Sequence, residues 1–157
     1  MTVVQNDLTG LILAAVAALA MIPSAKADSS VPDDGQAGVE ATLAKVNALV
    51  ARGGSAKEIA DAFYEDDLTI TGDGETGLYP DLKSFMKRLE IYSTNPTCRL
   101  NVVNKIRTSN TLAVAWVQEH CDAHGHESAE DYRILYVFRK SPKGWRTTME
   151  LFQKGTF

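Results

Sequence analysis

Three segments of the chain carry apolar residues at the three- and four-residue spacing of an amphipathic helix. Residues that start or stop helices stand beside each of them. Gly53-Gly54 follows the first, Ser55 to Glu58 form a capping box at the second, and Asn95-Pro96 follows the third. We therefore expect helices that begin near Val39, Ser55 and Pro80.

The period of the apolar residues changes to two elsewhere in the chain. Leu68 to Thr71 predicts a short strand, and Thr76 to Tyr79 is expected to pair back on it across Gly72-Asp73-Gly74. After Thr97, turn residues at Ser109-Asn110 and at 141–144 separate the strands of an antiparallel meander. The meander strands are expected at residues 98–108, 111–122, 129–140 and 145–152. This order predicts an α+β domain whose helices lie on one face of a curved sheet.

The first 38 residues depart from this pattern. Leu8 to Pro23 is almost wholly apolar but shorter than the roughly 20 residues of a membrane helix, and Ala25-Lys26-Ala27 supplies small residues for a signal peptidase. Residues 1–27 are therefore typical of a signal peptide, with a membrane-anchoring helix or a core helix as the alternatives. Residues 28–38 are polar and predict a flexible leader. We expect a domain over residues 39–157 in a periplasmic or secreted protein.

The composition restricts the classes of partner. The chain has 157 residues, of which 45% are hydrophobic, which suffices for one core and one domain. The net charge of -4 is spread along the chain without runs of lysine or arginine, so we expect neither nucleic acid nor a membrane surface as partner after cleavage. No motif predicts a cofactor.

The hairpin around Ser109-Asn110 bears on the two cysteines. If these two residues form the tight turn, Thr108 faces Thr111 and Cys98 faces Cys121. Opposite Cα atoms then lie about 4.5 to 5.5 Å apart, which a disulfide tolerates. A disulfide is expected in an exported protein, and two small buried thiols are the alternative.

The stretch EHCDAHGHE, residues 119–127, contains all three histidines of the chain. A metal site there would need ligands from His120, His124 and His126 to converge from a loop without rigid support. A polar connection between two strands has the same composition. We therefore predict no metal site.

Two further features suggest a ligand site. Tyr132, Ile134, Tyr136 and Phe138 share one face of a strand. If Lys140 faces Trp145 across the closing hairpin, Met149 lies opposite Tyr136 and Leu151 opposite Ile134, so that they continue the same apolar wall. This wall is either plain core or the lining of a cavity in which a tyrosine hydroxyl is the polar anchor. Asp73 lies among glycines at a strand end, either as a functional residue or in an Asp-Gly turn.

Three stretches of the sequence carry a family resemblance: IADAFYEDDLTITGDG, ETGLYPDLKSFMKRL and VFRKSPKGWRTTMELFQKG. They are similar to the second helix with its strand, the start of the third helix, and the closing hairpin of the nuclear transport factor 2-like superfamily, which includes SnoaL-like proteins and ketosteroid isomerases. The resemblance covers Val39 to Lys154. It implies a cone-shaped antiparallel sheet wrapped around three helices, a deep apolar pocket, and a homodimer formed through the outer face of the sheet.

The isomerases of this superfamily carry a general base at the end of the first strand, with two hydrogen-bond donors on a helix and on the penultimate strand. In this chain the base position falls on Gly72, one residue before Asp73. The helix donor falls near Asn47 or Ala48 and the strand donor on Tyr136. For an enzyme, the resemblance implies Asp73 as proton acceptor and Tyr136 or His120 as its partner.

We expect an exported SnoaL-like domain that binds a small apolar molecule. A cofactor-independent isomerase or lyase acting beside a carbonyl is the alternative, and a dimeric interaction module with a filled pocket is a third. The residues expected to line the pocket are Phe63, Phe85, Trp116, Ile134, Phe138, Met149 and Leu151.

Overall fold

The computed structural model describes residues 34–74, 78–104, 106–125 and 128–157. The predicted signal peptide, residues 1–27, lies outside them, as does most of the predicted leader. Within these ranges, no helix combines the length and the apolar character that crossing a bilayer requires.

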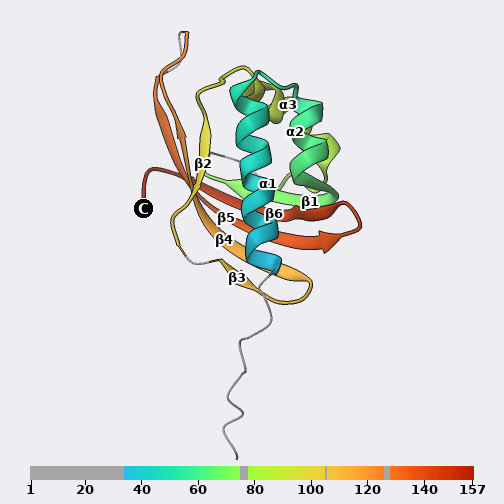
Figure 1. Cartoon of the computed structure of the whole chain (residues 1–157). Coiled ribbons are helices and arrows are strands. Elements are labelled where there is room, and N and C mark those ends of the chain that lie inside the picture. Colours follow the sequence, from blue (N-terminus) through green and yellow to red (C-terminus); the bar gives the residue numbers. More distant parts are fainter. Residues whose placement is uncertain (1–33, 75–77, 105, 126–127) are drawn as a thin grey trace, which may run out of the picture. The chain divides into compact units, whose positions relative to one another are not determined.

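Three helices precede or interrupt the sheet, as the apolar spacing predicts (Figure 1). They are α1 (Asp34–Ala51), α2 (Ala56–Phe63) and α3 (Leu82–Ser93). The capping box of α2 is present, because the Ser55 side chain accepts from the Glu58 amide and the Glu58 side chain accepts from the Ser55 amide. Gly53 ends the first helix with a positive φ of 69°, a conformation that glycine adopts without strain.

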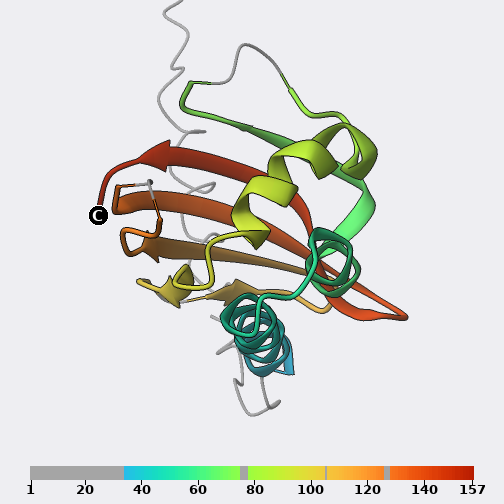
Figure 2. The ribbon, with the colours of Figure 1, turned by 90° about the horizontal axis from the view of Figure 1, so that it is seen from above.

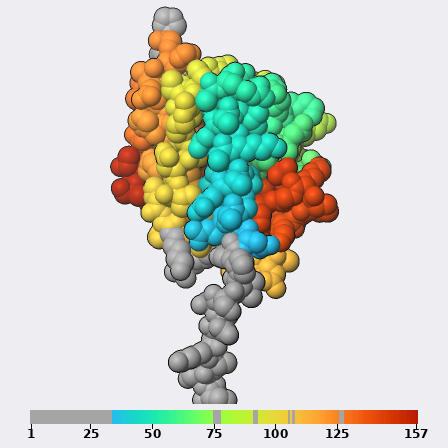
Figure 3. All heavy atoms as spheres, viewed as in Figure 1, coloured from blue at the N-terminus to red at the C-terminus, as the bar shows by residue number. Residues whose placement is uncertain are grey.

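The strands form one curved six-stranded sheet, and the three helices lie against one face of it (Figures 1 and 2). The order across the sheet is β1-β6-β5-β4-β2, with β3 pairing β4. The strands are β1 (Tyr64–Gly72), β2 (Arg99–Val102), β3 (Arg107–Thr108), β4 (Leu112–Cys121), β5 (Glu130–Ser141) and β6 (Gly144–Lys154). This is the predicted α+β architecture, and α1 and α2 form the surface over the helical side (Figure 3).

The first strand differs from its prediction. It begins at Tyr64, and its ladder partner is β6, which runs parallel to it. Only a single antiparallel bridge, between Ile70 and Tyr79, represents the predicted return strand; Thr76 lies outside the described residues. A local alternation of apolar residues identifies a strand, but it contains no information about a partner that lies some eighty residues later.

The two cysteines pair as predicted, although the turn of their hairpin lies at a different position from the predicted one. The amide of Ser109 donates to the carbonyl of Leu112, so the turn is centred on Asn110 and Thr111. The pairing then shifts by two residues before β2, where Arg99 faces His120. The two departures cancel, and a disulfide joins Cys98 to Cys121 with their Cα atoms 4.0 Å apart.

A bulge in β6 changes the register predicted for the closing hairpin. Lys140 does face Trp145, but Thr148 is an extra residue between the pairs Phe138–Thr147 and Val137–Met149. One inserted residue turns every later side chain to the opposite face of the strand. Glu150 therefore faces inward opposite Tyr136, and the predicted pairing of Tyr136 with Met149 is wrong.

Helix α1 begins at Asp34, inside the predicted leader of residues 28–38 and five residues before the predicted helix start at Val39. The reason is tertiary packing against β6. The Thr42 hydroxyl donates to the Trp145 carbonyl, and the Trp145 ring lies directly over Gly38. A polar, glycine-rich segment is thus helical because a distant aromatic ring covers it.

Gly38→Ala is expected to lower the free energy of unfolding by about 1 to 2 kcal/mol, since overpacking outweighs the helical preference of alanine. A Cβ atom at Gly38 would lie 2.3 Å from Cδ1 of Trp145. Urea unfolding measures the change. In a Trp145→Leu background the same substitution is expected to be neutral or stabilising, and an equal loss in both backgrounds would contradict this account.

Candidate functional site

A cavity of about 50 Å³ lies between the helices and the inner face of the sheet. Its wall is mostly aliphatic and aromatic, with carboxyl, phenol and amide groups among the apolar side chains. The lining residues are Val46, Asn47, Val50, Ile59, Phe63, Tyr64, Phe85, Leu89, Cys98, Leu100, Glu119, Tyr136 and Glu150. All three helices and five of the strands that surround this space contribute to it.

Glu150 is the most deeply buried carboxyl group of this wall, with 6% of the residue exposed. The Tyr64 hydroxyl donates to its Oε2 atom at 2.9 Å. Within the described part of the chain this is the one hydrogen bond of the Glu150 side chain, so its second carboxyl oxygen has no protein donor there, and Glu150 lines the cavity. Such a group is costly to bury, and its presence suggests a role beyond packing.

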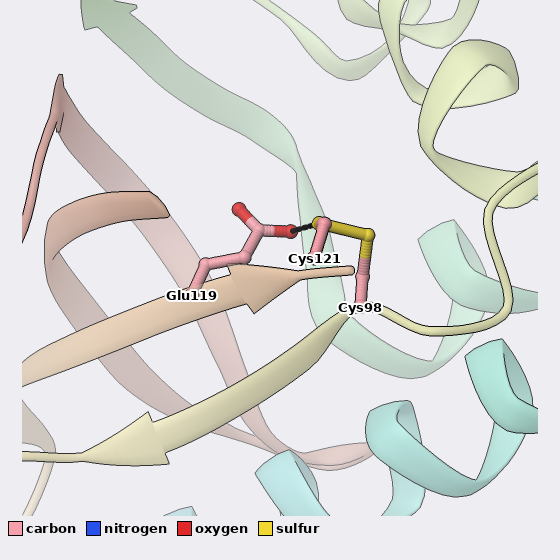
Figure 4. A group of neighbouring side chains, drawn as sticks. All are labelled: Cys98, Glu119 and Cys121. Carbon is pink, nitrogen blue, oxygen red and sulfur yellow. Dashed lines mark hydrogen bonds between the residues drawn. A yellow bond between two sulfur atoms is a disulfide. The ribbon is translucent and has the colours of Figure 1, made fainter. Parts of the chain in front are cut away.

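Glu119 places a second carboxyl group in the same wall, next to the disulfide. Its Oε1 atom lies 4.0 Å from Sγ of Cys121 (Figure 4). A disulfide sulfur carries no proton, so this contact supplies no hydrogen bond to the carboxylate. Cys98, Glu119 and Cys121 lie close enough to suggest a metal site, but their sulfur atoms are bonded to each other and offer no thiolate.

Burial shifts both carboxyl groups toward their neutral forms. It raises the pKa of Glu150 to about 8, against the opposing effect of the Tyr64 hydrogen bond, and the charge of Glu119 adds to the rise. Burial likewise raises the pKa of Glu119 to about 7, with a further contribution from the charge of Glu130. Two carboxyl groups of one cavity therefore change their protonation near neutral pH.

Neighbouring aromatic rings pack around Tyr64, whose hydroxyl binds Glu150. Phe63 packs edge-to-face on Tyr64 at 4.8 Å and on Tyr136 at 5.1 Å between ring centroids. Tyr64 packs in the same way on Phe85 at 5.7 Å. Since Tyr64 is fixed by two rings, the hydroxyl that binds Glu150 is positioned by the core itself.

The predicted pocket residues separate into three groups. Phe63, Phe85 and Tyr136 line the cavity. Ile134 and Phe138 are buried in the core beside it, with 1% and 0% exposed. Trp116, Met149 and Leu151 lie on the outer face of the sheet, exposed by 41 to 49%, so the prediction that they line the pocket is wrong. For Met149 and Leu151, the bulge at Thr148 is the physical reason.

Asp73 does not reach the cavity. It is exposed at the end of β1, where its Oδ2 atom accepts from the Lys154 amide at 3.3 Å. Gly72, which occupies the position of the general base in the isomerases, cannot carry a side chain, because a Cβ atom there would lie 2.4 Å from the carbonyl oxygen of Phe152. The structure therefore does not bring Asp73 and Tyr136 together.

His120 lies on the outer face of β4 between two aspartates. Its Nδ1 atom is 2.9 Å from Asp131 and its Nε2 atom is 3.2 Å from Asp122. Hydrogen bonds to Asp131 and then Asp122 raise the pKa of His120. This arrangement holds the imidazole away from the cavity, so His120 is not a partner of Tyr136. His124 is exposed, and His126 lies outside the described residues.

Tyr64, Glu119 and Glu150 are the site residues that the sequence pattern did not reveal. Glu150 is the one acid in the run from Trp145 to Phe152, which is a usable signal. Glu119 stands beside Cys121 in a strand whose alternate positions are small and apolar. Asn47 does line the cavity near the predicted helix-donor position, but both ends of its amide bind the Leu100 backbone.

Comparison with known proteins supports the fold. No protein-family model matches the chain, and no curated protein matches it either. An NTF2-like protein of unknown function from Methylobacillus flagellatus superposes with a TM-score of 0.61 at 19% identity, covering 81% of this chain and 97% of that one. A ketosteroid isomerase-like protein from Erwinia carotovora atroseptica gives 0.57 at 19% identity, covering 80% and 100%.

A third solved structure, an NTF-2 like protein of unknown function from Shewanella oneidensis, has a TM-score of 0.63 at 11% identity and covers 76% of this chain and 98% of that one. Other similar structures are described as having a cystatin-like fold. The chain therefore has the nuclear transport factor 2-like fold, as its sequence suggested. At these identities the likeness concerns the fold alone.

Proposed function

We propose that this domain binds a small molecule in the cavity, with the polar end of the molecule against Glu119 and Glu150 and its apolar part against the aromatic rings. The observation that carries the proposal is Glu150, a buried residue of the cavity wall whose second carboxyl oxygen has no protein donor in the described part of the chain. A bound polar group would compensate the cost of burying that oxygen.

The size of the cavity restricts the ligand. Drug-sized ligands occupy roughly 300 to 1,000 Å³, whereas this cavity has about 50 Å³. One water requires roughly 10 to 15 Å³ on this scale, so the space corresponds to a few non-hydrogen atoms. The ligand is therefore a very small molecule or the head group of a larger one.

Native mass spectrometry tests the proposal on protein exported through its own N-terminus and purified without a tag. The folded protein is expected to carry an organic mass that disappears under denaturing conditions. A bare subunit that also fails to take up small polar molecules would contradict ligand binding and favour an interaction module.

Catalysis is the second candidate function, and the paired carboxyl groups favour it. With pKa values of about 7 and about 8, Glu119 and Glu150 are suited to accept and return a proton at neutral pH. They replace Asp73 and His120 in this hypothesis. An isomerase or lyase acting beside a carbonyl is expected to exchange the α-protons of small ketones for deuterium, and Glu150→Gln is expected to abolish the exchange. Exchange that persists in Glu150→Gln would exclude this role.

We also propose that the protein is exported, because of the signal-peptide features of residues 1–27. The mature subunit is expected to begin at Asp28 and to weigh two hydrogens less than its reduced sequence. A mass that retains Met1 would contradict export.

A homodimer formed through the outer sheet face is proposed as the assembly. Trp116, Leu135 and Leu151 are paired across three adjacent strands there, and Trp116 and Leu151 are exposed by 41% and 48%. Contiguous exposed apolar groups of this kind mark interaction surfaces. Leu151→Arg is expected to yield a monomer in light scattering, whereas Leu78→Arg, at a leucine exposed by 62%, is expected to leave the dimer intact. A Leu151→Arg dimer would place the interface elsewhere.

A further inference from the structure

We infer that the molecule bound in the cavity is a small organic cation, whose ammonium group is held between the carboxyl groups of Glu119 and Glu150 and the surrounding aromatic rings. This inference rests on the proposed function, which it makes specific by assigning the charge of the ligand. The ligand contains no metal ion, and the charges, the aromatic rings and the volume of the site support its assignment as a cation.

The charges around the cavity are unbalanced. Two carboxyl groups line it, and among the described residues its lining includes no lysine or arginine. Arg88 on α3 acts electrostatically on Tyr132 and Glu130 but does not line the cavity. The other titratable groups near the two carboxyl groups are Tyr64, Tyr132, Tyr136 and Glu130. A cation is thus the group that the described part of the site lacks.

The aromatic rings favour the same kind of ligand. Phe63, Tyr64, Phe85 and Tyr136 all line the cavity. Aromatic faces attract cations, and the attraction grows when water is excluded, as in the cages that bind methylated ammonium groups. An ammonium bearing a few methyl groups also matches a space of about 50 Å³.

A neutral carbonyl compound is the competing ligand, and it would use only part of the site. Tyr64 already donates to Oε2, so the Tyr64 proton is directed at the carboxyl group. A carbonyl ligand would need a proton retained on the other oxygen and would use only one of the two carboxyl groups. A cation satisfies the free oxygen of Glu150 and also lies beside Glu119.

The two ligand classes shift the protonation of the site in opposite directions. A cation stabilises carboxylates, so its binding releases protons and tightens as the pH rises toward about 8. A carbonyl compound requires a protonated carboxyl group, so its binding takes up protons and weakens over the same interval. The sign of the proton exchange therefore identifies the class of ligand.

The experiment compares trimethylammonium with acetone, a neutral carbonyl compound of the same size, by titration followed in NMR spectra of the wild-type protein. Trimethylammonium is expected to bind at least about tenfold more tightly than acetone, a difference of about 1.4 kcal/mol. Calorimetry in two buffers of different ionisation enthalpy is expected to show proton release. Glu150→Gln and Glu119→Gln are each expected to weaken the cation about tenfold or more, while Glu90→Gln, at an exposed glutamate of α3, leaves it unchanged.

Each contrary result has a distinct meaning. Acetone binding as tightly as trimethylammonium, or with proton uptake, would overturn the cationic ligand and leave the proposed function intact. Binding of neither molecule at any pH would overturn both. Cation binding that survives in Glu150→Gln and Glu119→Gln would show that the carboxyl groups do not hold the ligand, which also overturns the inference.

Discussion

Glu150→Gln is expected to make the protein more stable than the wild type in alkaline solution and about equally stable in acid. The folded protein holds the pKa of Glu150 at about 8, above its usual value of 4.5. The neutral carboxyl therefore contributes its full stability below about pH 4.5, and this contribution is lost as the pH rises toward about 8. Each pH unit in this interval costs about 1.4 kcal/mol, so the total is on the order of 5 kcal/mol. Glutamine keeps an acceptor for Tyr64 and does not ionise.

Urea unfolding at about pH 5 and about pH 8.5 measures this difference. Glu90→Gln serves as the control, because it removes the same charge from an exposed position. If Glu150→Gln changed the stability by the same amount at both pH values, Glu150 would be ionised inside the folded protein. Burial would then not raise the pKa of Glu150 in the folded protein.

Removal of the disulfide is the second large effect that we expect. Cys98→Ala/Cys121→Ala should lower the free energy of unfolding by about 3 kcal/mol, because the bond closes a loop with a sequence separation of 23. The bond also attaches the start of the short edge strand β2 to the end of β4. Alanine is preferred over serine, since both cysteines are buried and a hydroxyl would need a partner there.

A reducing agent supplies the matched control. Wild-type protein in dithiothreitol is expected to unfold at the same urea concentration as the double variant, and the double variant is expected to be insensitive to dithiothreitol. Equal stability of oxidised and reduced wild type would show that the bond adds nothing to the folded state. Cys98 also lines the cavity, so ligand binding measured on the two forms reports whether β2 must be held in place.

Local chemistry made most of the fold predictable from the sequence. The capping box at Ser55 and Glu58 specifies the start of α2 without reference to the rest of the chain. The turns and alternating segments after Thr97 likewise place the meander, although the segment predicted as one strand at 98–108 forms two short strands, β2 and β3. What escaped prediction depends on contacts between distant segments. The parallel pairing of β1 with β6 and the helical start at Asp34 under Trp145 are examples.

The candidate site was harder to predict because it depends on register. Tyr136 was placed correctly, since its position on the inner face follows from alternation alone. Glu150 was missed because the bulge at Thr148 exchanges the inner and outer faces of β6, and no turn residue marks that position. The cysteine pairing shows the opposite case, in which two errors of register cancelled and left a correct disulfide.

The parallel pairing of β1 and β6 has a consequence for the order in which the protein folds. The hydrogen bond between Tyr64 and Glu150 joins residues 86 positions apart, and the whole β1 ladder depends on the last strand of the chain. Until residues 144–154 have been synthesised, β1 has no ladder partner and the cavity lacks the part of its wall that contains Glu150. Long-range closure of this kind is slow, so the domain is expected to stay unfolded until β6 has been synthesised. A chain that is late to fold also remains suited to transport through a narrow pore.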